Sequence, residues 1–287
     1  KILYFFCEKN RVMDQWQRFH IFDELNTHGI EILVFNPLDY PSIEDANRAL
    51  ITYVKNNSDI DIFMTPHNEE VIFTKTVAKL NIPKLLICFD NLVIPFAHKK
   101  IAKLFDLVWL TSIETEFLFK KWGANTVFMP YAANPNLFEV NLKSISEKSS
   151  VCFVGSPYGS RVNQINNLVK GNVDVDLYYG SRKNGIDIIS KNEFEFFKYI
   201  KPLYNLSKFS YGRRIILGAI KNKLVNIPYL NLDSENISQL SSVPIRELGA
   251  VYSSHKLCLS STAARNTGVL KNPVNIINLR SFEIPMS

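Results

Sequence analysis

Short apolar runs rich in β-branched and aromatic residues alternate with longer segments of helical period through the first 130 residues. This alternation is typical of a parallel sheet whose strands are joined by crossover helices. Several runs end in Asn, Asp, Ser or Thr, the residues that cap helices. The predicted strands cover 2–7, 31–35, 60–64, 84–89, 107–110 and 126–129, and the predicted helices cover 15–26, 43–56, 69–80, 97–105 and 113–122. These elements predict a complete doubly wound unit.

A polar, serine-rich stretch interrupts the pattern and predicts an interdomain linker at 139–150. A second alternation of strand and helix patterns follows it, so we predict domains at 1–138 and 151–287. We therefore predict an α/β chain of the GT-B type, with two Rossmann-like doubly wound domains facing a cleft. The second sheet has too few strands to be covered on both faces, so we expect it to be incomplete here. Its predicted elements are strand 151–154, turn 155–159, helix 161–170, strand 175–179, helix 211–224, helix 245–254, strand 256–259 and a short element at 278–284.

Composition and charge narrow the class of protein. The chain has 287 residues, of which 46% are hydrophobic and 21% charged, so it has ample material for packed cores. The net charge is about −2 over residues 1–145 and about +8 over the rest. The basic half could attract nucleic acid, an anionic membrane or a phosphorylated small molecule. Its basic residues are dispersed and form no stripe with aromatic residues, which disfavours nucleic acid.

The thiols and histidines predict no disulfide framework and no metal site. The four cysteines are scattered without a C-x-x-C pair, and each lies in or beside an apolar run. We expect buried thiols in a reducing cytoplasm. No apolar run approaches the roughly 18–20 residues of a membrane-spanning helix. The histidines show no metal-ligand spacing with one another or with the cysteines.

The segment 153–161, FVGSPYGSR, is a strand that ends in a Gly/Ser turn and enters a helix. Gly155 would let a ligand approach the backbone, Ser156 and Ser160 can donate hydrogen bonds, and Arg161 would add charge at the positive end of the helix dipole. The turn therefore predicts a phosphate-binding site. A plain strand–helix turn is the alternative. The chain contains neither G-x-G-x-x-G nor the P-loop motif, which disfavours classical dinucleotide binding and P-loop hydrolysis.

Four motifs in order carry a family resemblance: KWGANTVFMPYAANPNLF at 121–138, CFVGSPYGSR at 152–161, YYG at 178–180 and NLRSFEIPMS at 278–287. Together they resemble the GT-B glycosyltransferases, in particular the CgeB-like branch. The resemblance implies an enzyme that moves a sugar from a nucleotide sugar to a hydroxyl group in bacterial surface polysaccharide or glycoconjugate synthesis. The acceptor would be a glycan, a lipid-linked molecule or a protein. The last motif corresponds to the family's donor-site element, which glycine normally follows.

The resemblance also assigns donor-site roles. Glu283 would accept hydrogen bonds from the ribose hydroxyls, with an exposed glutamate at a helix start as the alternative. Helix dipole and arginine would replace a metal ion, so no cofactor is expected. Retaining relatives often carry a second glutamate eight residues earlier, where this chain has Asn275, which leaves retention of configuration unsupported. The implied donor-binding residues are Gly155, Ser156, Arg161, Tyr179, Gly180, Arg280 and Glu283, with Arg265 as a further candidate.

Two residues of the first domain are candidates for the catalytic base. Asp90 follows an apolar strand, at the edge where doubly wound folds present functional groups. It would take the proton of the acceptor hydroxyl in an inverting transfer, and the alternative is an N-cap for a following helix. His67 also follows a strand and could serve instead, with a capping or loop histidine as the alternative.

The segment 211–224 is basic with an apolar face, so it could contact an anionic membrane; an ordinary packing helix is the alternative. Rival functions on the same scaffold are a sugar-nucleotide epimerase, a phosphorylase, or a non-catalytic protein that binds nucleotide or nucleic acid.

Overall fold

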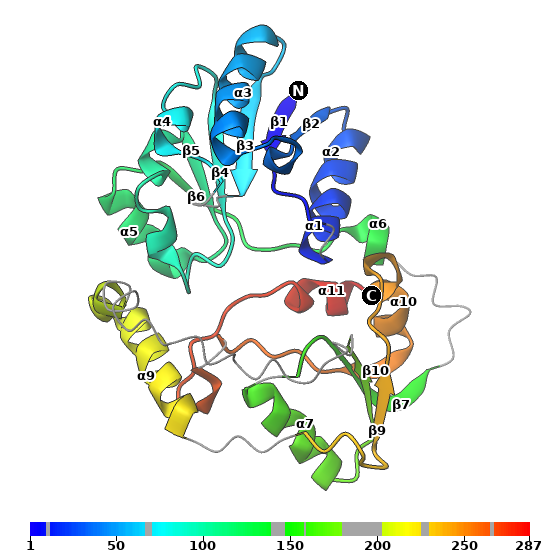
Figure 1. Cartoon of the computed structure of the whole chain (residues 1–287). Helices are drawn as coiled ribbons and strands as arrows, with labels where there is room; N and C mark the ends of the chain where they lie inside the picture. Colours follow the sequence, from blue (N-terminus) through cyan, green and yellow to red (C-terminus); the bar gives the residue numbers. More distant parts are fainter. Residues whose placement is uncertain are drawn as a thin grey trace. The chain divides into compact units, whose positions relative to one another are not determined.

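The computed structural model describes residues 1–9, 12–66, 71–138, 147–157, 159–179, 203–224, 230–264 and 267–287 (Figure 1). The chain divides into two compact units, Lys1–Tyr131 (unit 1) and Ala132–Ser287 (unit 2). Residues 132–138 group with unit 2, because Phe138 is buried there against Cys152 and Tyr252. Within the predicted linker, residues 148–150 already belong to a strand, and 139–146 lie outside the described residues.

In the part of unit 1 that the structure describes, six parallel strands form a sheet in the order β2-β1-β3-β4-β5-β6, as the apolar runs predict. Buried aliphatic and aromatic side chains on the central strands, such as Leu3, Phe63 and Leu86, form the core. The strands are β1 (Ile2–Phe5), β2 (Ile32–Phe35), β3 (Ile62–Pro66), β4 (Lys84–Cys88), β5 (Leu107–Leu110) and β6 (Thr126–Phe128).

The helices of unit 1 agree with the sequence prediction where the apolar period is strong. The predicted helix 15–26 is a continuous helical run with a π-helical middle, made of α1 (Val12–Gln17), η1 (Arg18–Asp23) and α2 (Glu24–Thr27). The other elements are η2 (Pro37–Asp39), α3 (Ile43–Asn56), α4 (Thr74–Val77), η5 (Ile113–Thr115) and α5 (Glu116–Lys121). Figure 1 shows α1 and α2 on one side of this sheet and α3, α4 and α5 on the other, as right-handed crossovers require.

Two predicted helices of unit 1 are wrong in extent. Of the helix predicted at 69–80, residues 69 and 70 lie outside the described residues, and the rest contains only α4. The Asn47 side chain bonds the backbone of Val71 and Phe73 and takes those groups out of a helical hydrogen-bond pattern. The helix predicted at 97–105 is two short 3₁₀ turns, η3 (Pro95–His98) and η4 (Ala102–Leu104). Each of these turns is too short to develop a helical repeat.

The described residues of unit 2 form a sheet of four parallel strands in the order β10-β7-β8-β9. The sequence analysis missed β9, because its polar sequence ISQL contains no apolar run. This segment is a strand because its backbone pairs with β8. The strands are β7 (Lys148–Val154), β8 (Val175–Tyr178), β9 (Ile237–Leu240) and β10 (His255–Cys258).

Two apolar layers cover the second sheet. On one face, Ile165 of α7 (Ser160–Lys170) packs on Phe153, Val175 and Leu177. On the other face, α6 (Pro135–Phe138), α10 (Leu248–Ser253) and α11 (Arg280–Met286) pack on Cys152, with η7 (Ile245–Glu247) leading into α10. The chain crosses from one face to the other between β9 and β10. Successive strands run from β7 to β8 to β9, and β10 then pairs on the opposite side of β7. The strand order thus reverses between β7 and β10, and doubly wound sheets bind ligands at such a switch point.

One long basic helix, α9 (Ser210–Leu224), packs beside η8 (Thr267–Val269). Its buried residues are the glycines Gly212 and Gly218, and Arg214 donates a hydrogen bond to the carbonyl of Pro273 at 2.7 Å. Leu217, Ile220 and Leu224 on the same helix are exposed. Among the residues that the structure describes, every helix falls short of the length and apolarity needed to cross a membrane.

Candidate functional site

The turn after β7 lies at the switch point of the second sheet. Gly155 has φ +122° and Gly159 has φ +57°, backbone conformations that side-chain-bearing residues rarely adopt. The Gly155 N–H donates to the carbonyl of Tyr178 at 2.9 Å, so β8 holds the start of the turn. Helix α7 begins directly after Gly159, so its free N–H groups lie at this edge of the sheet.

Arg280 is brought against this turn from far along the chain. A Cβ built on Gly155 would collide with the Arg280 guanidinium, whose Cζ would lie 3.3 Å away. The guanidinium also lies 5.9 Å from the ring centroid of Phe153. Asn278 holds the approach to α11, because its side chain donates to the Ser261 carbonyl at 2.8 Å and accepts from the Ser281 N–H at 3.3 Å. A glycine turn and a guanidinium are thus placed together.

Glu283 stands one helical turn beyond Arg280 and is only 4% exposed, so the reading of an exposed glutamate at a helix start is wrong. Burial raises the pKa of its carboxyl from 4.5 to about 7, although the Arg280 charge acts in the opposite direction. Tyr252 of α10 lies close by: burial first, and then the Glu283 charge, raise the pKa of its phenol. The carboxyl therefore changes charge near neutral pH in a largely dry setting.

The other donor-site candidates lie differently. Arg161 donates to the carbonyl of Ser156 at 3.3 Å, so it folds back on the turn. Tyr179 packs with the apolar cluster under α7, and its hydroxyl donates to Gln239 at 3.3 Å. Gly180 and Arg265 lie outside the described residues. Arg280, rather than Arg161, is therefore the guanidinium that touches Gly155.

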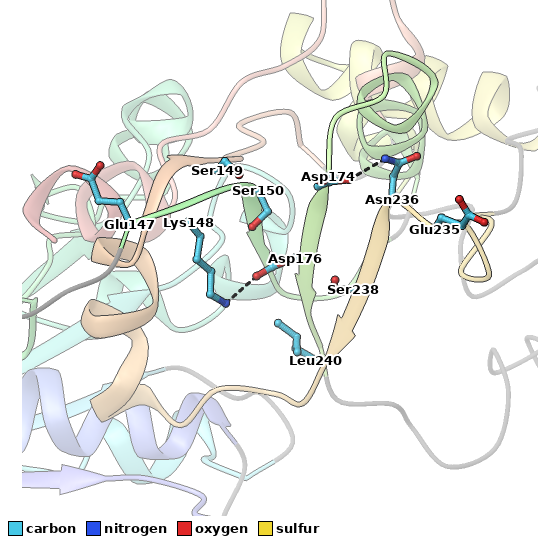
Figure 2. Close-up of a pocket in the computed structure, with 10 residues that line it drawn as sticks. All are labelled: Glu147, Lys148, Ser149, Ser150, Asp174, Asp176, Glu235, Asn236, Ser238 and Leu240. Atoms are coloured by element: carbon cyan, nitrogen blue, oxygen red, sulfur yellow. Dashed lines mark hydrogen bonds and ion pairs between the residues drawn. The ribbon is translucent and has the colours of Figure 1, made fainter.

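A separate polar recess of about 610 Å³ opens along β7, β8 and β9 of unit 2 (Figure 2). Figure 2 shows Lys148 paired with Asp176, and Asp174 paired with Asn236. Glu147 and Glu235 also line the recess, so its lining holds four carboxylates and one lysine. The net negative charge of this lining repels phosphate, so the recess does not suit the diphosphate that the Gly155 turn is predicted to bind.

Asp176 also ties the second sheet together. One of its oxygens accepts from Lys148 Nζ at 2.9 Å and from His255 Nε2 at 3.0 Å, which joins β7, β8 and β10. His255 Nδ1 in turn donates to the carbonyl of Val251 at 2.8 Å. Burial raises the pKa of Asp176, but the Lys148 and His255 contacts outweigh it and leave the pKa lowered. The buried Asp176 carboxylate therefore has a structural role, because both of its partners belong to other strands of the sheet.

In unit 1, Asp90 follows β4 with φ +54°, in the left-handed region. Asp90 is an exposed residue, although the surrounding protein atoms desolvate its carboxyl and raise its pKa. The backbone after it forms a turn, with the N–H groups of Val93 and Ile94 donating to the Asp90 carbonyl. No helix starts there: the next element is η3, whose N-cap Ile94 makes no side-chain cap. The N-cap alternative for Asp90 is therefore wrong.

The neighbouring Asn91, and not Asp90, makes the side-chain hydrogen bonds that hold the local backbone. Its side chain is fully buried and donates to the Ser112 carbonyl at 2.7 Å and to Thr115 Oγ1 at 2.6 Å. Its oxygen accepts from the N–H groups of Thr111 at 3.1 Å and Ser112 at 2.9 Å. Asn91 thus fixes the loops after β4 and β5, which leaves the Asp90 carboxyl available for another role.

An aromatic cluster surrounds this edge of unit 1. Phe89 and Tyr131 stack with ring centroids 6.0 Å apart, and Trp16 meets both rings edge-on. Trp16 also stacks on His20, which lies in the π-helical η1, a rare geometry that often occurs at functional sites. Burial lowers the pKa of His20 to about 4. Burial, aided by the Asp90 charge, raises the pKa of Tyr131 to about 12.

The sequence analysis missed Trp16, His20 and Tyr131 as members of one cluster. They belong to distant segments, and only the position of Tyr131, after the last strand, could have indicated the shared sheet edge. His67, the second candidate base, lies outside the described residues. Among the residues that the structure does describe, no group of three His, Cys, Asp or Glu side chains is placed to hold a metal ion.

Comparison with solved structures identifies the fold. HepE of Anabaena, solved in complex with UDP and glucose, superposes with a TM-score of 0.51 at 13% identity, over 92% of this chain and 75% of HepE. AviGT4, a glycosyltransferase involved in avilamycin A biosynthesis, gives a TM-score of 0.46 at 12% identity, over 90% of this chain and 69% of AviGT4. Neither a protein-family model nor a curated protein matches the sequence. The chain has the GT-B fold, with two Rossmann-like units on parallel sheets.

Proposed function

We propose that this chain is a glycosyltransferase that moves a sugar from a uridine diphosphate sugar to a hydroxyl group of an acceptor. The observation that carries the proposal is the meeting of Gly155, Arg280 and Glu283 at the switch point of the second sheet. The structural likeness to HepE, whose crystals hold UDP and glucose, supports this choice of donor.

The donor would be held by three kinds of contact in unit 2. Backbone N–H groups of the Gly155 turn and of the α7 start would bind the diphosphate, and the Arg280 guanidinium would stabilise the negative charge that grows on the leaving phosphate. Glu283 would accept hydrogen bonds from the two ribose hydroxyls. In this proposal Arg161 supports the turn through Ser156 and contributes less charge than Arg280.

The acceptor would be activated in unit 1. Asp90, with its raised pKa and its partly exposed carboxyl, would take the proton of the acceptor hydroxyl as that oxygen attacks the anomeric carbon. The stacked Phe89 and Tyr131 beside it would present an apolar wall to the acceptor. This route is an inverting displacement. Asn275 supports it, because this residue bonds Thr262 and offers no carboxylate at the position where retaining relatives have one.

The acceptor would be lipid-linked and met at a membrane surface. Leu217, Ile220 and Leu224 form an exposed apolar strip on α9, and Arg213, Lys221 and Lys223 lie on the same helix. Such a helix can rest on anionic lipid with its apolar strip in the headgroup layer. A glycan on a lipid carrier is an acceptor of this kind, and bacterial surface polysaccharide synthesis is the pathway class that supplies it.

A thermal-shift screen tests the proposed donor. The chain is heated with UDP, ADP, GDP and CDP, each at the same concentration, and then with sugar derivatives of the base that binds. At 100 times its dissociation constant a ligand stabilises the folded state by about 2.7 kcal/mol. We expect UDP and UDP sugars to raise the melting temperature. Equal shifts with all four nucleotides, or none, would contradict the proposed donor.

A further inference from the structure

Two cysteines face each other in the second sheet. Cys152 of β7 and Cys258 of β10 are register partners on adjacent parallel strands, and Leu259 N donates to the Cys152 carbonyl at 2.8 Å. Neighbouring strands lie about 4.8 Å apart, inside the Cα separation of about 4.4–6.8 Å that a disulfide spans. Register partners also project their side chains from the same face of the sheet. The backbone therefore brings both thiols to one place.

The two thiols are free and in direct contact, but their surroundings differ. They share a side-chain hydrogen bond, which raises the pKa of Cys152 and lowers that of Cys258. Cys152 is 1% exposed, whereas Cys258 is only half-buried. Cys258 Sγ also donates to the Tyr252 carbonyl at 3.6 Å. The more accessible thiol is thus also the one that ionises more readily, and the buried thiol lies next to it.

We infer that Cys152 and Cys258 form a reversible dithiol–disulfide pair, a redox modification site independent of glycosyl transfer. The oxidant is a small-molecule disulfide. The Cys258 thiolate attacks one of its sulfurs and releases one thiol, which leaves a mixed disulfide on Cys258. The Cys152 thiolate then attacks the Cys258 sulfur, releases the second thiol and closes the protein disulfide. The protein loses two electrons and two protons, and the small disulfide is reduced to two thiols.

The other two cysteines serve as internal controls. Cys7 follows β1 and Cys88 lies on β4, and β3 separates these two strands in the sheet. Neither has a cysteine as its register partner. The inference therefore predicts one specific pair out of the six that four cysteines allow.

Peptide mapping tests the pair. The folded chain is treated with oxidised glutathione, quenched in acid, alkylated with iodoacetamide in denaturant and digested with trypsin. We expect the peptides 149–161 and 257–265 to appear linked, two hydrogens lighter than their sum, and to separate on reduction. The peptides 2–9 and 85–99, which hold Cys7 and Cys88, should carry the alkyl group. The Cys152→Ser variant should keep glutathione on Cys258, because no second thiol can displace it.

Three results would overturn the inference. In the wild-type chain these are alkylation of both Cys152 and Cys258, a glutathione adduct that stays on Cys258, or a link to the peptide of Cys7 or Cys88. All three are read from the wild-type protein, so the test does not depend on whether a variant folds. Because the readout is a mass, failure of the proposed glycosyl transfer would not affect it.

Discussion

Both sheets carry one carboxyl with a raised pKa near their carboxyl edge, Asp90 in unit 1 and Glu283 in unit 2, yet the two surroundings are opposite in kind. Asp90 lies on a loop that Asn91 fixes, beside aromatic rings, with part of its surface open to solvent. Glu283 lies on helix α11 and is almost fully buried. It follows Arg280 by one helical turn, and the Arg280 guanidinium lies against Gly155. The first arrangement suits proton removal from a neutral ligand, and the second suits an anionic ligand with hydroxyl groups.

The largest expected effect separates catalysis from structure at Asp90. Asp90→Asn should lower the rate of UDP release from the donor sugar by about 10²- to 10⁴-fold, because the general base is lost. The melting temperature should stay the same, since asparagine tolerates the left-handed φ of +54° as well as aspartate does. Asp90→Ala is the matched control, which should lose activity and some stability. An Asp90→Asn protein that turns over normally would remove Asp90 from the mechanism.

A stability measurement sharpens the contrast at Glu283. The folded protein keeps the proton of this carboxyl up to about pH 7, whereas the unfolded chain releases it near pH 4.5, so stability should fall as pH rises through this window. The shift corresponds to about 3 kcal/mol at pH 8. Glu283→Gln should therefore be more stable than wild type at pH 8 and about equal at pH 4, as followed by urea unfolding. Equal stabilities at both pH values would show that the carboxyl is not desolvated.

Arg280 and Arg161 can be ranked against each other. Arg280→Gln should weaken UDP binding by about 10- to 100-fold and uridine binding much less, because its charge acts on phosphate. Arg161→Gln should weaken UDP binding less than Arg280→Gln, since the Arg161 guanidinium already bonds the Ser156 carbonyl. Calorimetric titration of both ligands into both variants measures this. A larger loss with Arg161→Gln would return the phosphate role to Arg161.

The smallest expected effect concerns the basic helix of unit 2. Leu217→Ser on α9 should lower binding to anionic phospholipid vesicles by about tenfold, because one leucine leaves the headgroup layer. Leu257→Ser on β10 is the matched control, an exposed leucine of the same unit that lies away from α9. Vesicle sedimentation compares the two. Equal binding of both variants and the wild type would exclude α9 as the contact.

The sequence predicted the strands far better than the short helical turns. The runs at 85–89 and 107–110 are apolar throughout, so burial favours them as the buried strands β4 and β5. The segment 69–80 failed because one side chain from another helix, Asn47, binds its backbone, and no local pattern shows such a contact. β9 was missed because its sequence is polar, and only its backbone pairing with β8 makes it a strand.

The candidate site was predictable only in part. Gly155 and Glu283 could be chosen from the motifs, but the contact of Arg280 with Gly155 joins residues more than a hundred positions apart. The burial of Glu283 depends on α10 and α11 packing together, so its raised pKa has no signal in the sequence. The cluster of Trp16, Phe89 and Tyr131 likewise forms only once α1 and the segments after β4 and β6 come together.

The most direct test of the donor site is the affinity of uridine at two pH values. Uridine has ribose hydroxyls and no phosphate, so it isolates the contact with Glu283. With a pKa of about 7, the carboxylate fraction rises about tenfold between pH 6 and pH 8, and uridine affinity in calorimetric titration should rise by the same factor. The Glu283→Gln variant should show weak binding that does not change with pH. Wild-type affinity that stays constant between pH 6 and pH 8, or falls, would contradict a nucleotide site built on Glu283.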